Sequence, residues 1–240
     1  MLKLDRVTFT GADDSIMPSS LVSISRDYPW VEWGILFSKS NQGKPRYPSQ
    51  EWLKEFYFLM AGHSEILRSA HLCGRWVREM MIDGELTWFA SDPNVGLFQR
   101  VQINFHGQYH AMHQSVPRQL GMKPSVRFIL QCDGPNDDQV SALAHMRVVV
   151  PLFDKSGGAG RLPDEWPRAW PGIYCGYAGG LGPDNIYEQI EHISKVSSGP
   201  FWVDMERRVR SEDDREFELG KVREVCRQVQ SYARDRGIVL

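Results

Sequence analysis

Side chains that can move protons stand at the ends of several short apolar runs. Asp154 directly follows one such run, and Asp204 lies near the end of another, two residues before Glu206. Carboxyl groups that lie close together raise one another's pKa, so that one can hold a proton while another accepts one. The pattern predicts an acid–base site in which Asp154 donates a proton and Glu206 or Asp133 abstracts one.

A thiol and an imidazole mark a third strand end. Cys73 ends an apolar run, and His71 lies two residues earlier on the same strand face. Cys73 could act as a thiolate base, or it could be a small buried apolar residue, which is how cysteines usually behave. A metal site built from these two with His106, Asp133 or Asp154 is conceivable. Nothing in the spacing matches a zinc pattern, however, and we expect no metal.

Two glycine-rich loops are candidates for binding an anion. One, DKSGGAG, covers residues 154–160 and contains Gly158; the other, AGGLGPDN, covers residues 178–185 and contains Gly179 and Gly180. Glycine lets backbone N–H groups approach a ligand, and the start of the helix that follows favours negative charge. Tight turns also use glycine, so the loops alone decide nothing.

The elements that must position these residues recur along the chain as eight β-rich runs separated by helical patterns. The runs are residues 7–10, 31–37, 69–73, 101–105, 126–132, 148–153, 173–177 and 201–205. Helix signals lie between them: Pro18 opens one helix, Pro48-Ser49 opens the next, and residues 76–81 form a third. An apolar stripe with helical spacing runs from Ile186 to Ile193, and the last helix ends near Gly237.

Eight strands alternating with helices predict a single (β/α)₈ barrel spanning residues 1–240. Residues 83–98 are irregular and are expected to insert an extra turn. An open doubly wound sheet is the alternative, but no G-x-G-x-x-G follows the first run. In a barrel, strand ends converge on one face, where loops seven and eight often bind phosphate.

The composition of the chain limits which classes of binding partner and which cellular compartment we expect. The net charge is −2 with 24% charged residues, which gives no reason to expect nucleic acid or a membrane surface as a partner. No apolar run is long enough to cross a bilayer. The four cysteines are far apart in the sequence, which favours a cytoplasmic protein with reduced thiols. We expect a monomer or a homodimer.

Several segments resemble phosphoribosylanthranilate isomerase, a (β/α)₈ enzyme. The segment YAGGLGPDNI at residues 177–186 is similar to the family's AGGL-x-P-E-N-V, and LFD at 152–154 followed by GGAG at 157–160 and Trp166 is similar to its strand-six loop. Weaker matches are Val203-Asp204 with Val209, Val101-Gln102 with His106-Gly107, Lys39-Ser40 with Arg46-Tyr47, and Phe9-Thr10-Gly11.

The resemblance implies an Amadori rearrangement of a phosphorylated aminopentose, without an organic cofactor. It assigns the general acid to Asp154, substrate contacts to Arg46 and Asp204, and a phosphate clamp to Gly179 and Gly180. Further contacts are expected at Thr10, His106 and Asp133, and at Gly158 for the phosphate.

Two departures from the family lie at the site. Thr10 stands where the family has its cysteine base, and a threonine hydroxyl does not deprotonate carbon unaided near neutral pH. Glu206-Arg207-Arg208 replaces a Ser-Ser-Gly loop, and Arg207 can replace the lost phosphate donors. We therefore expect a divergent isomerase or lyase acting on a small phosphorylated sugar derivative. The alternatives are a catalytically silent barrel that binds a phosphorylated metabolite or a protein partner, and the authentic isomerase with a relocated base.

Overall fold

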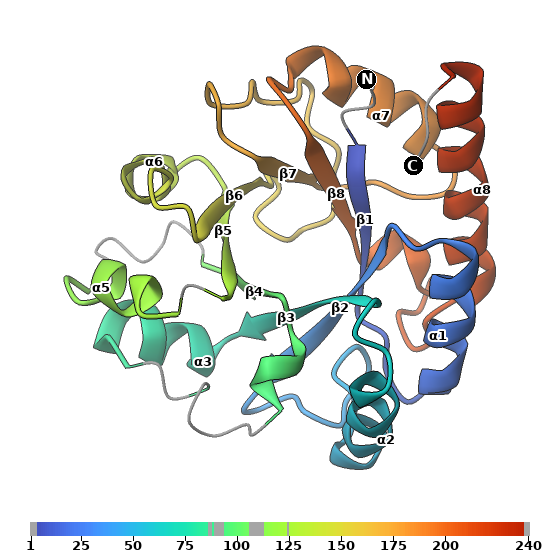
Figure 1. The fold of residues 1–240 in the computed structure, drawn as a ribbon, viewed down its shortest axis with the longest axis horizontal. Helices are drawn as coiled ribbons and strands as arrows, with labels where there is room; N and C mark the ends of the chain where they lie inside the picture. Colours follow the sequence, from blue (N-terminus) through green and yellow to red (C-terminus); the bar gives the residue numbers. More distant parts are fainter. Residues whose placement is uncertain (1–3, 86–87, 89–93, 106–112, 124, 238–240) are drawn as a thin grey trace.

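Eight parallel strands close into a barrel in the computed structural model, which describes residues 4–85, 88, 94–105, 113–123 and 125–237. Each strand pairs with the next, and β8 returns to pair with β1. In Figure 1 the strands converge at the centre, with the helices outside them. The strands are β1 (Leu4–Thr10), β2 (Val31–Ser38), β3 (Leu67–Cys73), β4 (Arg100–Ile103), β5 (Arg127–Cys132), β6 (Val149–Phe153), β7 (Cys175–Ala178) and β8 (Phe201–Met205).

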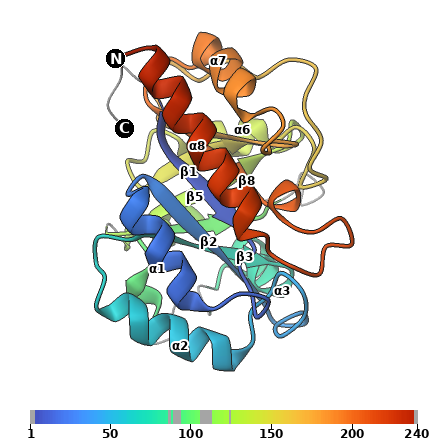
Figure 2. The same cartoon turned by 90° about the vertical axis from the view of Figure 1, so that its right-hand side faces the viewer.

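The helices cover the outer face of the barrel. Their sequence signals explain their bounds: Ser49 caps α2 by accepting a hydrogen bond from the Trp52 N–H (3.1 Å), and Ile186, Ile190 and Ile193 are the buried stripe of α7. In Figure 2, α8 lies between α7 and α1. The described helices are α1 (Pro18–Asp27), α2 (Gln50–Ala61), α3 (Arg75–Arg78), α5 (Val116–Gly121), α6 (Asp137–Leu143), α7 (Ile186–Val196) and α8 (Leu219–Asp235).

The predicted (β/α)₈ barrel is confirmed, and the alternative open sheet is wrong. Strand bounds differ from the prediction by a few residues; the seventh strand begins at Cys175 rather than at residue 173. The helix expected over residues 76–81 is present, but only its first part is α-helical: α3 continues as a π-helix over Glu79–Asp83, which ends at Gly84 with φ +72°. Within the irregular region, the structure describes a 3₁₀ turn at Val95–Leu97.

Polar side chains occupy the inside of the barrel. Strand residues alternate between the helix-facing and the inner side, so that Val31 and Trp33 face the helices while Glu32 faces inward. Glu32 is fully buried and accepts hydrogen bonds from Arg100 Nε (2.8 Å) and Thr8 Oγ1 (3.0 Å). Although burial raises the pKa of Glu32, the charges of Arg100 and its other neighbours lower it to about 2. The barrel therefore carries an ionised pair below its mouth.

Candidate functional site

A polar cavity of about 430 Å³ opens at the carboxyl ends of the strands. Such a position is where barrel enzymes place their substrates. Nine of the residues predicted from the sequence line it: Arg46, Cys73, Asp154, Gly158, Gly179, Gly180, Asp204, Glu206 and Arg207. Thr10 is not part of the described lining but donates a hydrogen bond to Asp204, and among the described residues Asp133 is not part of the lining either. His106 lies outside the described residues.

Asp154 organises the loop after β6. Its side chain is buried and accepts four hydrogen bonds: from Gln131 Nε2 (2.8 Å), the Gly158 N–H (2.7 Å), the Ser156 N–H (3.1 Å) and the Ser156 hydroxyl (2.6 Å). A carboxylate has about four acceptor positions. These four donors therefore fill the acceptor positions of Asp154, and the geometry shows a side chain that positions its loop.

Asp204 differs from Asp154 in its hydrogen bonding. It is 7% exposed, and it accepts one described side-chain hydrogen bond, from Thr10 Oγ1 at 2.7 Å. Burial raises the pKa of Asp204 to about 7; the Thr10 hydrogen bond opposes the shift, and the nearby carboxylates Glu206 and Glu32 add to it. Asp204 is thus a carboxyl group at the cavity that can gain and lose a proton near neutral pH.

A chain of polar side chains leads from Asp204 into the barrel. Thr10 Oγ1 lies 3.4 Å from His71 Nδ1, and His71 Nε2 lies 2.9 Å from Ser69 Oγ. Burial is the largest cause that lowers the pKa of His71, to about 3, so its ring is neutral at physiological pH. Gly34 makes room for the chain, since a Cβ there would lie 2.3 Å from Thr10 Oγ1 and 2.9 Å from the His71 ring.

Cys73 lines the cavity as a thiol. Burial raises the pKa of Cys73 to about 12, with the Glu206 charge adding to the shift and hydrogen bonds from Asn104 and Tyr47 opposing it. Asn104 Nδ2 lies 3.0 Å from its sulfur. Such a group holds its proton at neutral pH. The apolar interpretation of Cys73 fits this environment better than a thiolate base does.

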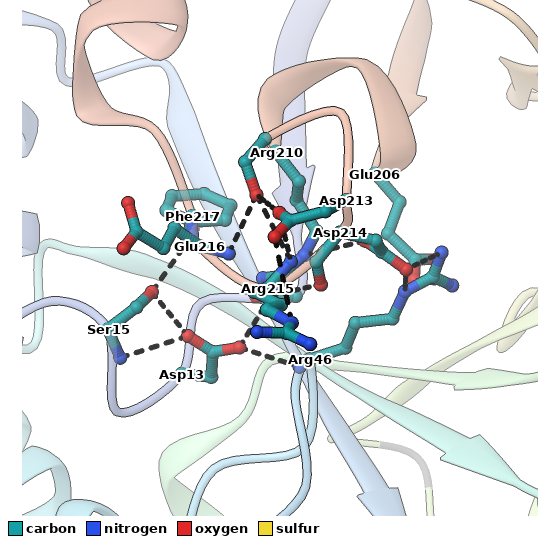
Figure 3. Close-up of polar contacts among 12 residues, drawn as sticks. Asp13, Ser15, Arg46, Glu206, Arg210, Asp213, Asp214, Arg215, Glu216 and Phe217 are labelled. Carbon is teal, nitrogen blue, oxygen red and sulfur yellow. Dashed lines mark hydrogen bonds and ion pairs between the residues drawn. The ribbon is translucent and has the colours of Figure 1, made fainter.

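Glu206 and Arg46 belong to a cluster of ion pairs at one side of the cavity, shown in Figure 3. Arg46 Nη1 donates to Glu206 Oε1 (2.9 Å), and Arg46 also pairs with Asp214. Buried Arg210 donates to Asp13 Oδ2 (2.7 Å) and to Asp214 Oδ1 (2.9 Å). The cluster joins the loops after β1, β2 and β8. Partial burial raises the pKa of Glu206, and the Arg46 charge opposes that shift.

The residues predicted to bind phosphate differ in the contacts they make within the protein. The Gly158 N–H is used by Asp154. Gly180 has φ +65°, and a Cβ there would lie 2.4 Å from the Leu162 backbone nitrogen, so the glycine allows close packing of two loops. Arg207 is exposed at the rim of the cavity, and no described residue pairs with its guanidinium. Arg207 is therefore the cation best placed to meet an anionic ligand.

Several lining residues were absent from the predicted site. Gln102 and Asn104 extend inward from the β4 segment, with Gln102 Nε2 donating to Asn104 Oδ1 (2.9 Å). The buried Gln102 Oε1 has no partner in the described part of the chain. Arg208 also lines the cavity and donates to the Gly180 carbonyl (3.1 Å). The alternation of inward positions on β4 is the signal that could have identified Gln102.

The fold and this cavity define a (β/α)₈-barrel protein with carboxyl, amide and guanidinium groups around one strand-end cavity. Comparison with known proteins adds no family: no family model matches the chain, and no curated sequence matches it. Among the described residues, no group of three or more His, Cys, Asp or Glu side chains could hold a metal ion. None of the described helices has both the length and the apolar character needed to span a bilayer.

Proposed function

We propose that the protein is an isomerase, or a lyase with the same proton chemistry, that acts on a small phosphorylated sugar derivative. The observation that carries the proposal is that the buried carboxyl groups of Asp154 and Asp204 face one polar cavity with Arg207 at its rim. We further propose that the chain is a divergent relative of the phosphoribosylanthranilate isomerases and, because its four cysteines are free, a cytoplasmic protein.

The chemistry of the lining supports this substrate class. Gln102, Asn104 and Gln131 offer amide groups suited to the hydroxyls of a sugar, and Arg207 offers a charge suited to a phosphate. A cavity of about 430 Å³ is in the range of small-molecule sites. Isomerisation of such a sugar needs only proton transfers, which carboxyl groups perform.

A silent binding protein is the second candidate, and two observations favour it. All four acceptor positions of Asp154 are filled, and Arg46 pairs with Glu206 and Asp214. In a binding protein these groups would shape the cavity without exchanging protons.

Deuterium exchange separates the two candidates. The protein is incubated in D₂O with phosphorylated pentoses, hexoses and N-substituted aminopentose phosphates, and each compound is examined by mass spectrometry and NMR. We expect deuterium at a carbon next to the carbonyl or imine of at least one compound. Binding without exchange, seen by calorimetry, would favour the silent barrel. Growth of a tryptophan auxotroph that lacks phosphoribosylanthranilate isomerase would identify the authentic isomerase instead.

A further inference from the structure

Asp204 lines the cavity and accepts a hydrogen bond from buried Thr10. We propose that Asp204 is the group that exchanges a proton with the substrate carbon, and that Thr10 and His71 are positioning residues that orient it. This inference rests on the proposed function. It places the proton exchange on β8, the strand that pairs with β1.

The direction of each hydrogen bond in the chain follows from the first one. The Thr10 hydroxyl has one hydrogen, which it donates to Asp204 Oδ1 (2.7 Å), so Thr10 must be the acceptor toward His71 Nδ1 (3.4 Å). A neutral imidazole carries one N–H, which is then on Nδ1, and His71 Nε2 accepts from the Ser69 hydroxyl (2.9 Å). Every donor in the chain therefore points toward the Asp204 carboxylate.

The barrel wall holds this chain in place. Thr10, His71 and Ser69 are each 1% exposed or less, and they come from two strands that flank β2. On β2 itself, the absence of a side chain at Gly34 lets Thr10 and His71 meet. Buried groups with few alternative partners hold their rotamers, which is what a proton-transfer group needs from its supports.

Charged groups on neighbouring strands act in opposite directions on the ionisation of Asp204. Glu206, which directly follows β8, and Glu32 on β2 disfavour its ionised form, while Arg100 on β4 favours it. Asp154 faces the same cavity, but its loop donors fill its acceptor positions. Of the two carboxyl groups, Asp204 accepts fewer described hydrogen bonds, and none of them comes from a loop backbone.

The proposed isomerisation needs only the substrate, Asp204 and protons from solvent. The Asp204 carboxylate takes the proton from the carbon next to the carbonyl or imine, and the C–H electron pair becomes the C=C bond of an enediol or enamine. The carbonyl oxygen or imine nitrogen takes up the electron pair of its double bond and receives a proton from solvent. The Asp204 carboxyl group exchanges its proton with solvent at the cavity and then delivers a proton to the neighbouring carbon, and the enediol or enaminol hydroxyl gives its proton back to solvent.

Carboxyl NMR tests the positioning part without any substrate. Protein labelled with ¹³C at aspartate carboxyls is titrated, and the Asp204 signal is assigned as the one lost in Asp204→Asn. We expect its midpoint near neutral pH and a rise of about one pH unit or more in Thr10→Val, because that variant removes a donor to the carboxylate. Thr10→Ser keeps the hydroxyl and should leave the midpoint close to that of the wild type. A midpoint near that of an ordinary aspartate, or no response to Thr10→Val, overturns the inference.

Histidine NMR tests the direction of the chain in the same sample. In ¹⁵N spectra above the Asp204 midpoint, His71 should be the Nδ1–H tautomer, and this preference should weaken in Thr10→Val. An Nε2–H tautomer under these conditions contradicts the chain.

The exchange assay then tests the chemical part. Asp204→Asn should lose at least about 100-fold in deuterium incorporation, the usual scale for a lost acid–base group. The surface variant Asp138→Asn, which makes the same chemical change, should keep the wild-type rate. Exchange that persists in Asp204→Asn refutes the role of Asp204 while the proposed function stands. Absence of exchange in the wild-type protein with every compound refutes the proposed function, whereas the positioning chain is judged by the two NMR titrations.

Discussion

Replacing Asp204 by asparagine should stabilise the protein at alkaline pH. Asparagine keeps the size of the side chain and an oxygen that can accept the Thr10 hydrogen bond, but it carries no charge. Wild-type Asp204 is 7% exposed and, with a pKa of about 7, must ionise in a site that disfavours its charge. The variant avoids that cost.

The magnitude follows from the raised pKa. The folded protein holds the Asp204 proton up to about pH 7, whereas an ordinary aspartate releases it near 3.8. Between these values the folded state binds more protons than the unfolded state, so wild-type stability falls as pH rises. Three pH units at about 1.4 kcal/mol each give an upper bound of about 4 kcal/mol. Linkage depends only on the two pKa values, so we expect nearly this whole amount between about pH 4 and about pH 8.5.

Chemical denaturation of both proteins, at about pH 4 and about pH 8.5, measures the effect. The difference between variant and wild type is taken at each pH, and the two differences are then subtracted, which removes any pH-independent cost of the substitution. We expect Asp204→Asn to gain about 4 kcal/mol in its free energy of unfolding at the higher pH relative to the lower. An unchanged difference across the pH range would refute the raised pKa and the reasoning built on it.

The remaining predictions concern the loops around the cavity. Asp154→Asn should lower the melting temperature by roughly 5 °C, because its amide would face the Gly158 N–H as a second donor; an unchanged melting curve would contradict the loop-positioning role. Arg210→Met should cost about 3 to 5 kcal/mol in denaturant titrations, since Asp13 would be left buried without its cation, and a cost below about 1 kcal/mol would show that Asp13 is rescued by solvent. Gly180→Ala should cost at least about 1 to 2 kcal/mol at φ +65°, and unaltered unfolding would mean that the two packed loops separate freely.

The barrel could be predicted because each strand can be recognised from its own apolar run in the sequence. Parallel strands buried on both faces form short apolar runs, and helical patterns separate them, so the number and order of strands needed no tertiary information. The ends of the strands were harder to predict. Residues 173 and 174 are as apolar as those inside β7, yet they lie before it. The π-helix after α3 leaves no mark in the local pattern.

The location of the site could be predicted from the sequence, but the role of each carboxyl group in it could not. Strand-end polarity pointed to Asp154, Asp204 and Glu206 before their contacts were known, and all three line the cavity. Which carboxylate is saturated with donors depends on the path of the glycine loop, and which one keeps a proton depends on burial by distant segments. Asp133 shows the limit of the pattern: it follows a strand as Asp154 does, but its backbone N–H is bonded to Asn136 Oδ1, and it is absent from the described lining.

The contact between Arg210 and Asp13 joins positions 197 residues apart in the sequence. Closing a loop of that length is an entropic cost that must be met before the contact can form. Asp13 follows the first strand and Arg210 follows the last, so their pairing requires the β1–β8 seam to be closed. The two ends of the chain must therefore meet before this side of the cavity is complete.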